Sequence, residues 1–376
     1  MSKSVGGKQA SVSFQSATTY LPKLDGLRAV SIALVLAEHF VLDGYGLGGT
    51  GVTIFFVISG YLITSILISY ADTLPVKQAA ITFYWRRSLR LFPVYYLCIG
   101  IAAALGIGGM RQTWWINGLY LTNFKVAIDN AWNGSSHFWS LCIEEQFYLL
   151  WFLVVVVMPR KVLLPAIIAC IFIAPFYRGL MHVIGMTPFV DFLLPGVMDS
   201  LATGALLSYL SIFYREKLHW QIFVKFRFVG LMLSLGAVSA LYVLGSDLLS
   251  RISLHCFVNV FSACLVALCV ETTNDQKSDW LRGKLIRHLG KISYGIYVYH
   301  YFVPELIDAH MHFNWLHSYT GGRILRVVCH IAASVGIAEV SWYAMEKPIL
   351  KLKDRFSFET HQGQSAPLAP RAVAKD

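Results

Sequence analysis

The sequence has 376 residues, of which 56% are hydrophobic and only 14% are charged. Soluble domains carry charge on about a quarter of their residues, so this composition excludes an ordinary soluble protein and predicts an all-α, polytopic bundle of transmembrane helices. The net charge of +10 at first suggests a nucleic-acid partner. Most of the Lys and Arg residues, however, fall in segments assigned to the cytoplasm if both termini lie there, as the positive-inside rule requires. We therefore expect no nucleic-acid partner.

Ten apolar stretches have roughly the length that crosses the hydrocarbon core of a bilayer. They lie at 27–43, 51–70, 91–108, 138–158, 162–180, 194–213, 228–245, 252–270, 291–308 and 325–345. With both termini cytoplasmic, they predict about ten spans within one membrane domain at 21–355. The polar segments 1–20 and 356–376 are expected to be disordered, with no soluble domain appended. The seven cysteines form no CxxC motif, so neither a disulfide framework nor a metal site is predicted.

The first apolar stretch carries two ionisable residues, Arg28 and His39, eleven positions apart. On a helix this spacing brings both side chains to within about 20° of one face and about 16 Å apart along the axis. Ionisable residues inside a membrane are costly and are candidates for a functional site. Two alternatives stay open: Arg28 as a snorkelling anchor and His39 as a hydrogen-bonded structural residue.

The second stretch contains a run rich in Gly and aromatic residues at 51–63, whose small residues predict close helix packing. Ser59 in this run either contacts a substrate or bonds its own helix backbone. Further along, Arg86, Arg87 and Arg90 have spacings of three and four, which lets all three converge on one anion. They either anchor the helix to lipid phosphates or bind the phosphates of a cytoplasmic donor, and arginine favours the forked phosphate contact.

The fourth stretch carries adjacent carboxylates, Glu144 and Glu145, about two turns from its outer end. His39 reaches a similar depth on its own helix. Packing alone hardly explains two carboxylates there, because an unpaired buried carboxylate is expensive, and we assign them to a functional site. Asp199 and His300, in the sixth and ninth stretches, stay open between a structural network and the same site.

Motifs follow one another along nearly the whole predicted membrane domain, at 24–28 with His39, 51–63, 84–93, 139–149, Asp199 with Gly204, 293–300 and 346–348. In this order they resemble the membrane acyltransferase-3 family of bacterial integral-membrane O-acyltransferases. The resemblance implies a multi-pass enzyme of the bacterial inner membrane. Such an enzyme would move an acyl group, expected to be acetyl, from cytoplasmic acetyl-CoA to a hydroxyl of a glycan, a lipid-linked saccharide or another acceptor at the outer side.

The resemblance also implies roles for individual residues. His39 would be the general base and Arg28 its partner on the same helix. Glu144 would hold the imidazole, with Glu145 as the neighbouring candidate. Acyl-CoA binding would involve Arg86, Arg87, Arg90, Ser59 and Tyr61, and the acceptor side or its support would involve Trp139, Ser140, Asp199 and His300.

No cofactor is expected to be bound permanently, because acetyl-CoA is a substrate, and membrane lipids are the remaining partners. Some relatives carry an extra extracytoplasmic domain, so we expect this chain either to act alone or to pass its acyl group to a separate extracytoplasmic protein.

One competing interpretation is a transporter or flippase for a lipid-linked sugar, in which the intramembrane Glu, Asp and His residues form a proton relay. Inverted repeats, which many such proteins contain, are not found between the two halves of the sequence. Another is a non-catalytic subunit of a cell-wall assembly, which would tolerate alanine at Arg28, His39 and Glu144.

Overall fold

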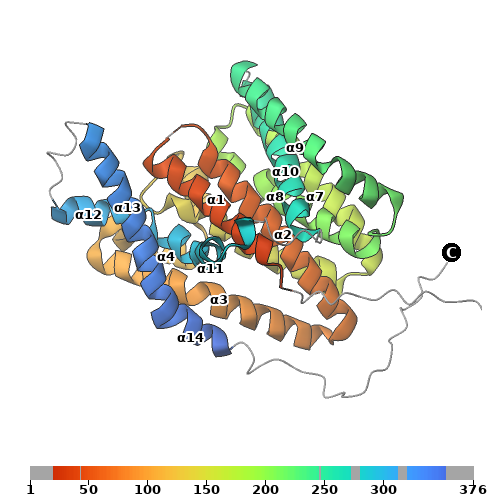
Figure 1. The fold of residues 1–376 in the computed structure, drawn as a ribbon, viewed down its shortest axis with the longest axis horizontal. Helices are drawn as coiled ribbons and strands as arrows, with labels where there is room; N and C mark the ends of the chain where they lie inside the picture. Colours follow the sequence, from red (N-terminus) through yellow and green to blue (C-terminus); the bar gives the residue numbers. More distant parts are fainter. Residues whose placement is uncertain (1–19, 43, 245–246, 272–279, 312–319, 353–376) are drawn as a thin grey trace, which may run out of the picture.

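The computed structural model describes residues 20–42, 44–244, 247–271, 280–311 and 320–352 (Figure 1). Within these ranges the chain forms helices, turns and bends, and no strand. The predicted all-α fold is therefore confirmed for the described part. The segments expected to be disordered, 1–20 and 356–376, lie outside the described residues except for Tyr20.

Fourteen α-helices and several short 3₁₀ and π segments follow one another along the described chain. The α-helices are α1 (Pro22–Phe40), α2 (Leu47–Thr73), α3 (Val76–Leu105), α4 (Met110–Gly118), α5 (Thr122–Asp129), α6 (Trp139–Phe152), α7 (Leu163–Val183), α8 (Leu194–Phe213), α9 (Leu218–Leu244), α10 (Asp247–Val270), α11 (Lys284–Tyr299), α12 (Val303–Met311), α13 (Thr320–Ser341) and α14 (Lys347–Leu350). The short segments are η1 (Ile107–Gly109), η2 (Ser136–Phe138), η3 (Leu153–Val157), η4 (Arg160–Val162), η5 (Pro188–Phe192), η6 (Trp280–Arg282) and η8 (Trp342–Glu346).

Eight helical segments among the described residues are long and apolar enough to cross a membrane. They are α2, α3, α7, α8, α9, α10, α6 together with the flanking η2 and η3, and α13 together with the following η8 and α14. The predicted count of ten is not confirmed. The first predicted span lies on α1, which carries four charged residues, and the ninth lies on α11, which has only 16 residues.

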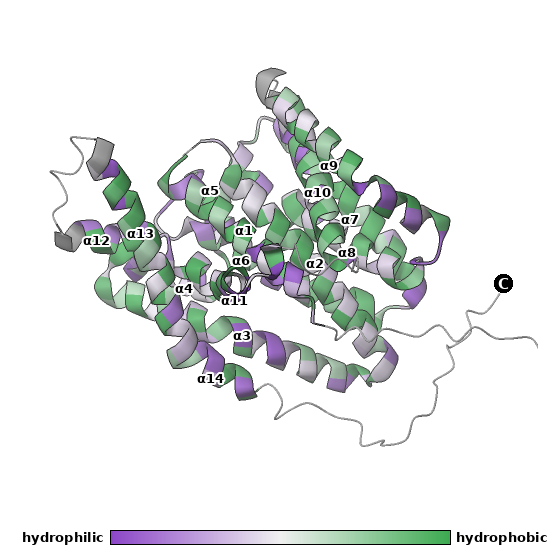
Figure 2. Ribbon diagram, viewed as in Figure 1, coloured by the Kyte–Doolittle hydropathy of each residue, from purple (hydrophilic) through white to green (hydrophobic). Residues whose placement is uncertain are grey.

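Apolar side chains cover the outside of several helices, as a lipid environment requires. On α7 and α9, Phe172, Phe176 and Leu233 are each about 70% exposed. Figure 2 shows α7, α9 and α10 as mainly hydrophobic, whereas α3 carries hydrophilic stretches along its length. The surface thus agrees with a multi-pass membrane protein.

Helices α2 and α8 cross with their backbones in contact. A Cβ atom added to Gly60 would lie 1.9 Å from the carbonyl oxygen of Leu201, and one added to Gly204 would lie 2.1 Å from that of Val57. Only glycine fits at such distances, so the close packing predicted for 51–63 is confirmed. Helix α2 also packs against α1, α6 and α10, so it is a central helix of the bundle (Figure 1).

Helix α1 packs between α2 and α11 and runs in the same direction as α11. Near their N-terminal ends a Cβ atom added to Gly290 would lie 1.7 Å from the carbonyl oxygen of Asp25. At the other end of the pair His39 contacts His300, which follows α11 directly. This pairing brings the first predicted span beside the ninth and assembles the polar residues described next.

Candidate active site

A cavity lies between five helices, α1, α2, α3, α6 and α11. Its polar lining consists of Arg28, Ser59, Arg87, Arg90, Ser140, Glu144, Tyr148, Ser293, Tyr294 and Tyr297. Apolar residues, chiefly of α2, complete the wall. Five of the motifs singled out in the sequence therefore meet in one space, although they are far apart along the chain.

Three guanidinium groups line this cavity, those of Arg28, Arg87 and Arg90. Glu144 is the carboxylate that lines it with them, so positive charge is in excess. Arg90 lines the cavity and also has part of its surface exposed. Arg28 is held by a 2.7 Å hydrogen bond to Asp25, which also accepts a hydrogen bond from Tyr20. The cavity is therefore suited to an anion carrying several charges.

Aromatic and hydroxyl groups orient one of these arginines. The guanidinium carbon of Arg87 lies 4.0 Å from the ring centre of Tyr148, a cation–π contact. The hydroxyl groups of Tyr148 and Ser59 are 2.5 Å apart and share a hydrogen bond. Ser59, which the sequence left open, thus contacts another helix across the cavity wall.

Two residues predicted to bind acyl-CoA do not line this cavity. Arg86 instead donates a hydrogen bond of 3.1 Å to the hydroxyl of Tyr70 on α2, so in this structure only Arg87 and Arg90 of the three arginines meet at the cavity. Tyr61 is buried in a second hydrophobic cluster that includes Leu207 and Val266, residues of α8 and α10. Its place on α2 turns it away from the arginines.

His39 and His300 form a hydrogen-bonded pair next to Tyr297, which lines the cavity, although neither histidine lines it. Nδ1 of His39 lies 2.8 Å from Nε2 of His300, and the two rings are nearly parallel with centres 5.0 Å apart. His39 is exposed, whereas His300 is fully buried. Nδ1 of His39 is thus hydrogen-bonded to His300. The sequence analysis had expected Glu144 to hold this imidazole.

Hydroxyl groups join the cavity wall to His137, which in turn contacts the histidine pair. The hydroxyl of Tyr297 lies 2.6 Å from that of Ser140 and donates a 2.8 Å hydrogen bond to the carbonyl oxygen of His137. The ring of His137 stacks on Tyr301 and meets the edge of His300 at 5.3 Å. The sequence analysis did not single out His137, although a histidine directly before an apolar stretch was a signal that could have identified it.

The two adjacent carboxylates face different surroundings. Glu144 lines the cavity, where its charge interacts with Arg87 and Arg28. Glu145 does not line it, and one of its carboxylate oxygens is buried without a hydrogen-bond partner among the described residues. Its charge interacts with Arg87 and Glu144. Of the two, Glu144 is the residue placed to meet a bound molecule.

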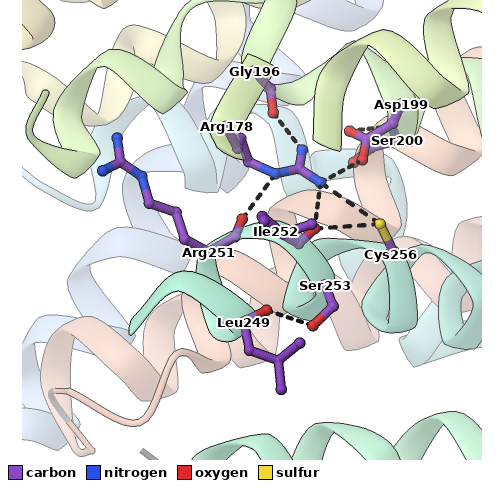
Figure 3. Close-up of polar contacts among 9 residues, drawn as sticks. All are labelled: Arg178, Gly196, Asp199, Ser200, Leu249, Arg251, Ile252, Ser253 and Cys256. Carbon is purple, nitrogen blue, oxygen red and sulfur yellow. Dashed lines mark hydrogen bonds and ion pairs between the residues drawn. The ribbon is translucent and has the colours of Figure 1, made fainter. Parts of the chain in front are cut away.

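Asp199 belongs to a separate structural network, drawn in Figure 3. It forms a 3.0 Å ion pair with Arg178 of α7, and both side chains are almost fully buried. Arg178 also donates hydrogen bonds to the carbonyl oxygens of Gly196, Arg251 and Ile252. Because its partners join α7, α8 and α10, and because Asp199 does not line the cavity, we assign the pair to stability.

Trp139 likewise supports the wall without lining it. Its ring is packed against Phe56, which does line the cavity, and against Phe192 of η5. Its neighbour Ser140 does line the cavity, as do Glu144 and Tyr148 further along the same motif.

Comparison with known proteins identifies the family. A family model described as an acyltransferase domain matches residues 21–342. The chain belongs to the acyltransferase-3 family. Within this acyltransferase-3 domain lie all the residues that line the cavity, together with both histidines of the pair. The resemblance inferred from the motifs is confirmed.

Relatives of this acyltransferase-3 chain include peptidoglycan O-acetyltransferase OatA of Listeria monocytogenes, 29% identical over 362 residues, and O-acetyltransferase OatA of Staphylococcus aureus, 26% identical over 362 residues. A third is the putative peptidoglycan O-acetyltransferase YrhL of Bacillus subtilis, 27% identical over 367 residues. Each match covers 88% of this chain but only 55–57% of the relative, so the chain spans a little over half their length. No solved structure matches the chain.

Proposed function

We propose that this protein transfers an acetyl group from acetyl-CoA to a hydroxyl of a cell-envelope glycan, with His39 as the general base. The family and its O-acetyltransferase relatives support transfer of an acyl group to oxygen. The observation that carries the proposal for this chain is the arrangement of an arginine-lined cavity next to a pair of histidines.

The donor half of the proposal rests on the charge of the cavity. CoA carries several phosphates on a long, thin pantetheine arm. Arg28, Arg87 and Arg90 would hold the phosphates by charge-assisted hydrogen bonds, and the apolar wall of α2 would receive the arm. The thioester would then point toward Tyr297 and the histidines.

The acceptor half rests on the exposed imidazole. In the proposed step an acceptor hydroxyl gives its proton to His39 while its oxygen attacks the thioester carbon. The carbon–sulfur bond breaks, and the departing CoA sulfur takes up one proton, so that the products are an ester and CoA. A neutral imidazole near pH 7 is a suitable base for this reaction.

The names of the relatives indicate peptidoglycan as the first acceptor to try. We place the acceptor at the outer face of the bacterial inner membrane and the donor at the cytoplasmic face. The acyl group would reach the glycan either directly or through a separate extracytoplasmic protein.

The test is release of CoA thiol from acetyl-CoA by purified protein in detergent, with and without peptidoglycan fragments. We expect release that rises with the fragments and that falls by about 10²- to 10⁴-fold in a His39→Gln variant, the range in which a general base contributes. Release that is equal in the two proteins would exclude His39 from the mechanism. Absence of both release and acetyl-CoA binding would instead favour a transporter that uses its intramembrane acids as a proton path.

A further inference from the structure

The tautomer of His300 follows from the way in which α11 ends. The last four carbonyl groups of a helix have no partner within it and need another donor. The carbonyl of Ile296 accepts the backbone N–H of His300, whereas the carbonyl of Tyr297 accepts from Nδ1 of the His300 ring at 2.7 Å. Because a carbonyl oxygen can only accept, Nδ1 of His300 carries a hydrogen atom.

This capping bond determines the roles in the contact with His39. A neutral imidazole protonated at Nδ1 has a lone pair on Nε2. Nε2 of His300 therefore accepts the 2.8 Å hydrogen bond, and Nδ1 of His39 donates it. The alternative, a His300 protonated on both nitrogens, would place a cation in a fully buried position beside His137, at a high cost in free energy.

With its hydrogen atom on Nδ1, His39 keeps the lone pair on Nε2. We infer that His300 is a positioning residue that fixes His39 in this tautomer, so that Nε2 of His39 is the atom that takes the acceptor proton. This inference rests on the proposed function for its catalytic meaning, but the tautomer itself does not depend on turnover.

The role resembles that of a carboxylate in a catalytic triad, with one difference. A carboxylate both orients the imidazole and stabilises the imidazolium formed in the reaction. A neutral imidazole at this position orients His39 through the same kind of hydrogen bond but brings no negative charge. The proton on His39 is therefore easily returned to the leaving sulfur of CoA, which needs one.

The first test measures the tautomer directly, by solid-state NMR of ¹⁵N-histidine-labelled protein in lipid bilayers at a pH where both rings are neutral. The signals of His39 are identified as those lost in the His39→Gln protein. We expect His39 to carry hydrogen on Nδ1 and a lone pair on Nε2. Hydrogen on Nε2 of His39 would overturn the inference.

The second test separates positioning from helix capping with two matched variants. In His300→Gln the amide oxygen reaches the place of Nε2 and can accept from His39. In His300→Asn the amide group reaches the place of Nδ1 and can cap Tyr297 but does not reach His39. We expect the Gln variant to keep at least ten times the kcat of the Asn variant, with an unchanged KM for acetyl-CoA in both.

An Asn variant as active as the Gln variant, or more active, would show that His300 serves only the end of α11 and would overturn the inference. Size-exclusion profiles of both proteins must match the wild type, so that a folding defect is not mistaken for a catalytic one. A wild-type protein that releases no CoA thiol counts against the proposed function, while the NMR result still decides the role of His300.

Discussion

The central carbon of the Arg87 guanidinium lies 4.0 Å from the ring centre of Tyr148, while the Tyr148 hydroxyl is bonded to Ser59. One aromatic side chain thereby ties a cation of α3 to a hydroxyl of α2. Arginine side chains lose conformational freedom when they bind a ligand, so a guanidinium already held by a ring binds an anion at a lower entropic cost.

Replacing Tyr148 tests this support. Tyr148→Phe keeps the ring under Arg87 and removes the bond to Ser59, whereas Tyr148→Leu removes both. Because a cation–π contact contributes about 0.5–2 kcal/mol, we expect the Leu variant to raise the KM for acetyl-CoA by about 2- to 30-fold and the Phe variant to change it much less. Steady-state thiol-release assays of the two proteins measure the difference. Equal KM values would show that the ring does not position Arg87.

The three arginines of α3 offer a comparison within one helix. Arg87→Ala and Arg90→Ala each remove a guanidinium from the cavity wall, and Arg86→Ala removes one that bonds Tyr70 instead. A hydrogen bond to a charged group contributes about 1.5–3 kcal/mol, so the first two variants should weaken binding of acetyl-CoA by about 10- to 100-fold. Arg86→Ala serves as the control, with little change. Calorimetric titration of each protein with CoA provides the measurement, and three equal losses would contradict the assignment.

Breaking the buried pair of Figure 3 should affect stability and not donor binding. Asp199→Ala leaves the charge of Arg178 buried without its partner carboxylate, a loss of about 3–5 kcal/mol. The matched control is Asp72→Ala, whose partner Arg160 and whose own side chain are both more than one-third exposed, and which should cost about 0–1 kcal/mol. Thermal unfolding in detergent compares the two. Similar unfolding midpoints would show that the Arg178–Asp199 pair does not stabilise the bundle.

Close packing of α2 on α8 predicts a strong effect of one added methyl group. Gly60→Ala would place its Cβ 1.9 Å from a backbone oxygen of Leu201, so the two helices must separate. Gly100→Ala on α3 meets no atom within 4 Å and is the control. We expect a lower yield of monodisperse protein for the first variant only, measured by size-exclusion chromatography. A normal yield for Gly60→Ala would mean that α2 and α8 can shift at little cost.

Much of the site could be predicted because its residues are costly in a membrane. Charged and imidazole groups in Arg28, His39 and Glu144 interrupt apolar stretches, and Arg87 lies in a cluster of arginines just before one, so these residues stand out in the sequence without knowledge of the fold. The spacing of Arg28 and His39 indicated a common side of α1, and in the structure Arg28 lines the cavity together with residues of α11 while His39 bonds His300 at the C-terminal end of α11.

Pairings between distant helices could not be predicted in the same way. Helical spacing puts Arg86 within about 40° of Arg90, so spacing alone would place both at the cavity. Arg86 instead bonds the neighbouring Tyr70 on α2, a contact that the sequence does not indicate. Asp199 bonds Arg178, 21 positions away in the sequence, and His39 bonds His300, 261 positions away. Both pairings depend on which helices are adjacent in the fold. The count of ten spans stays unconfirmed for another reason: α1 is more charged, and α11 shorter, than a helix that crosses a bilayer independently.

The close backbone contact between Asp25 and Gly290 fixes the relative position of α1 and α11 far from the His39–His300 pair. His39 lies fourteen residues further along α1, about 21 Å away. A change of only about 3° in the crossing angle at this contact would therefore move the imidazole by about 1 Å, enough to cost a large part of the rate when reacting groups must be aligned. The close packing that Gly290 permits against Asp25 thus helps to determine the position of His39 relative to His300.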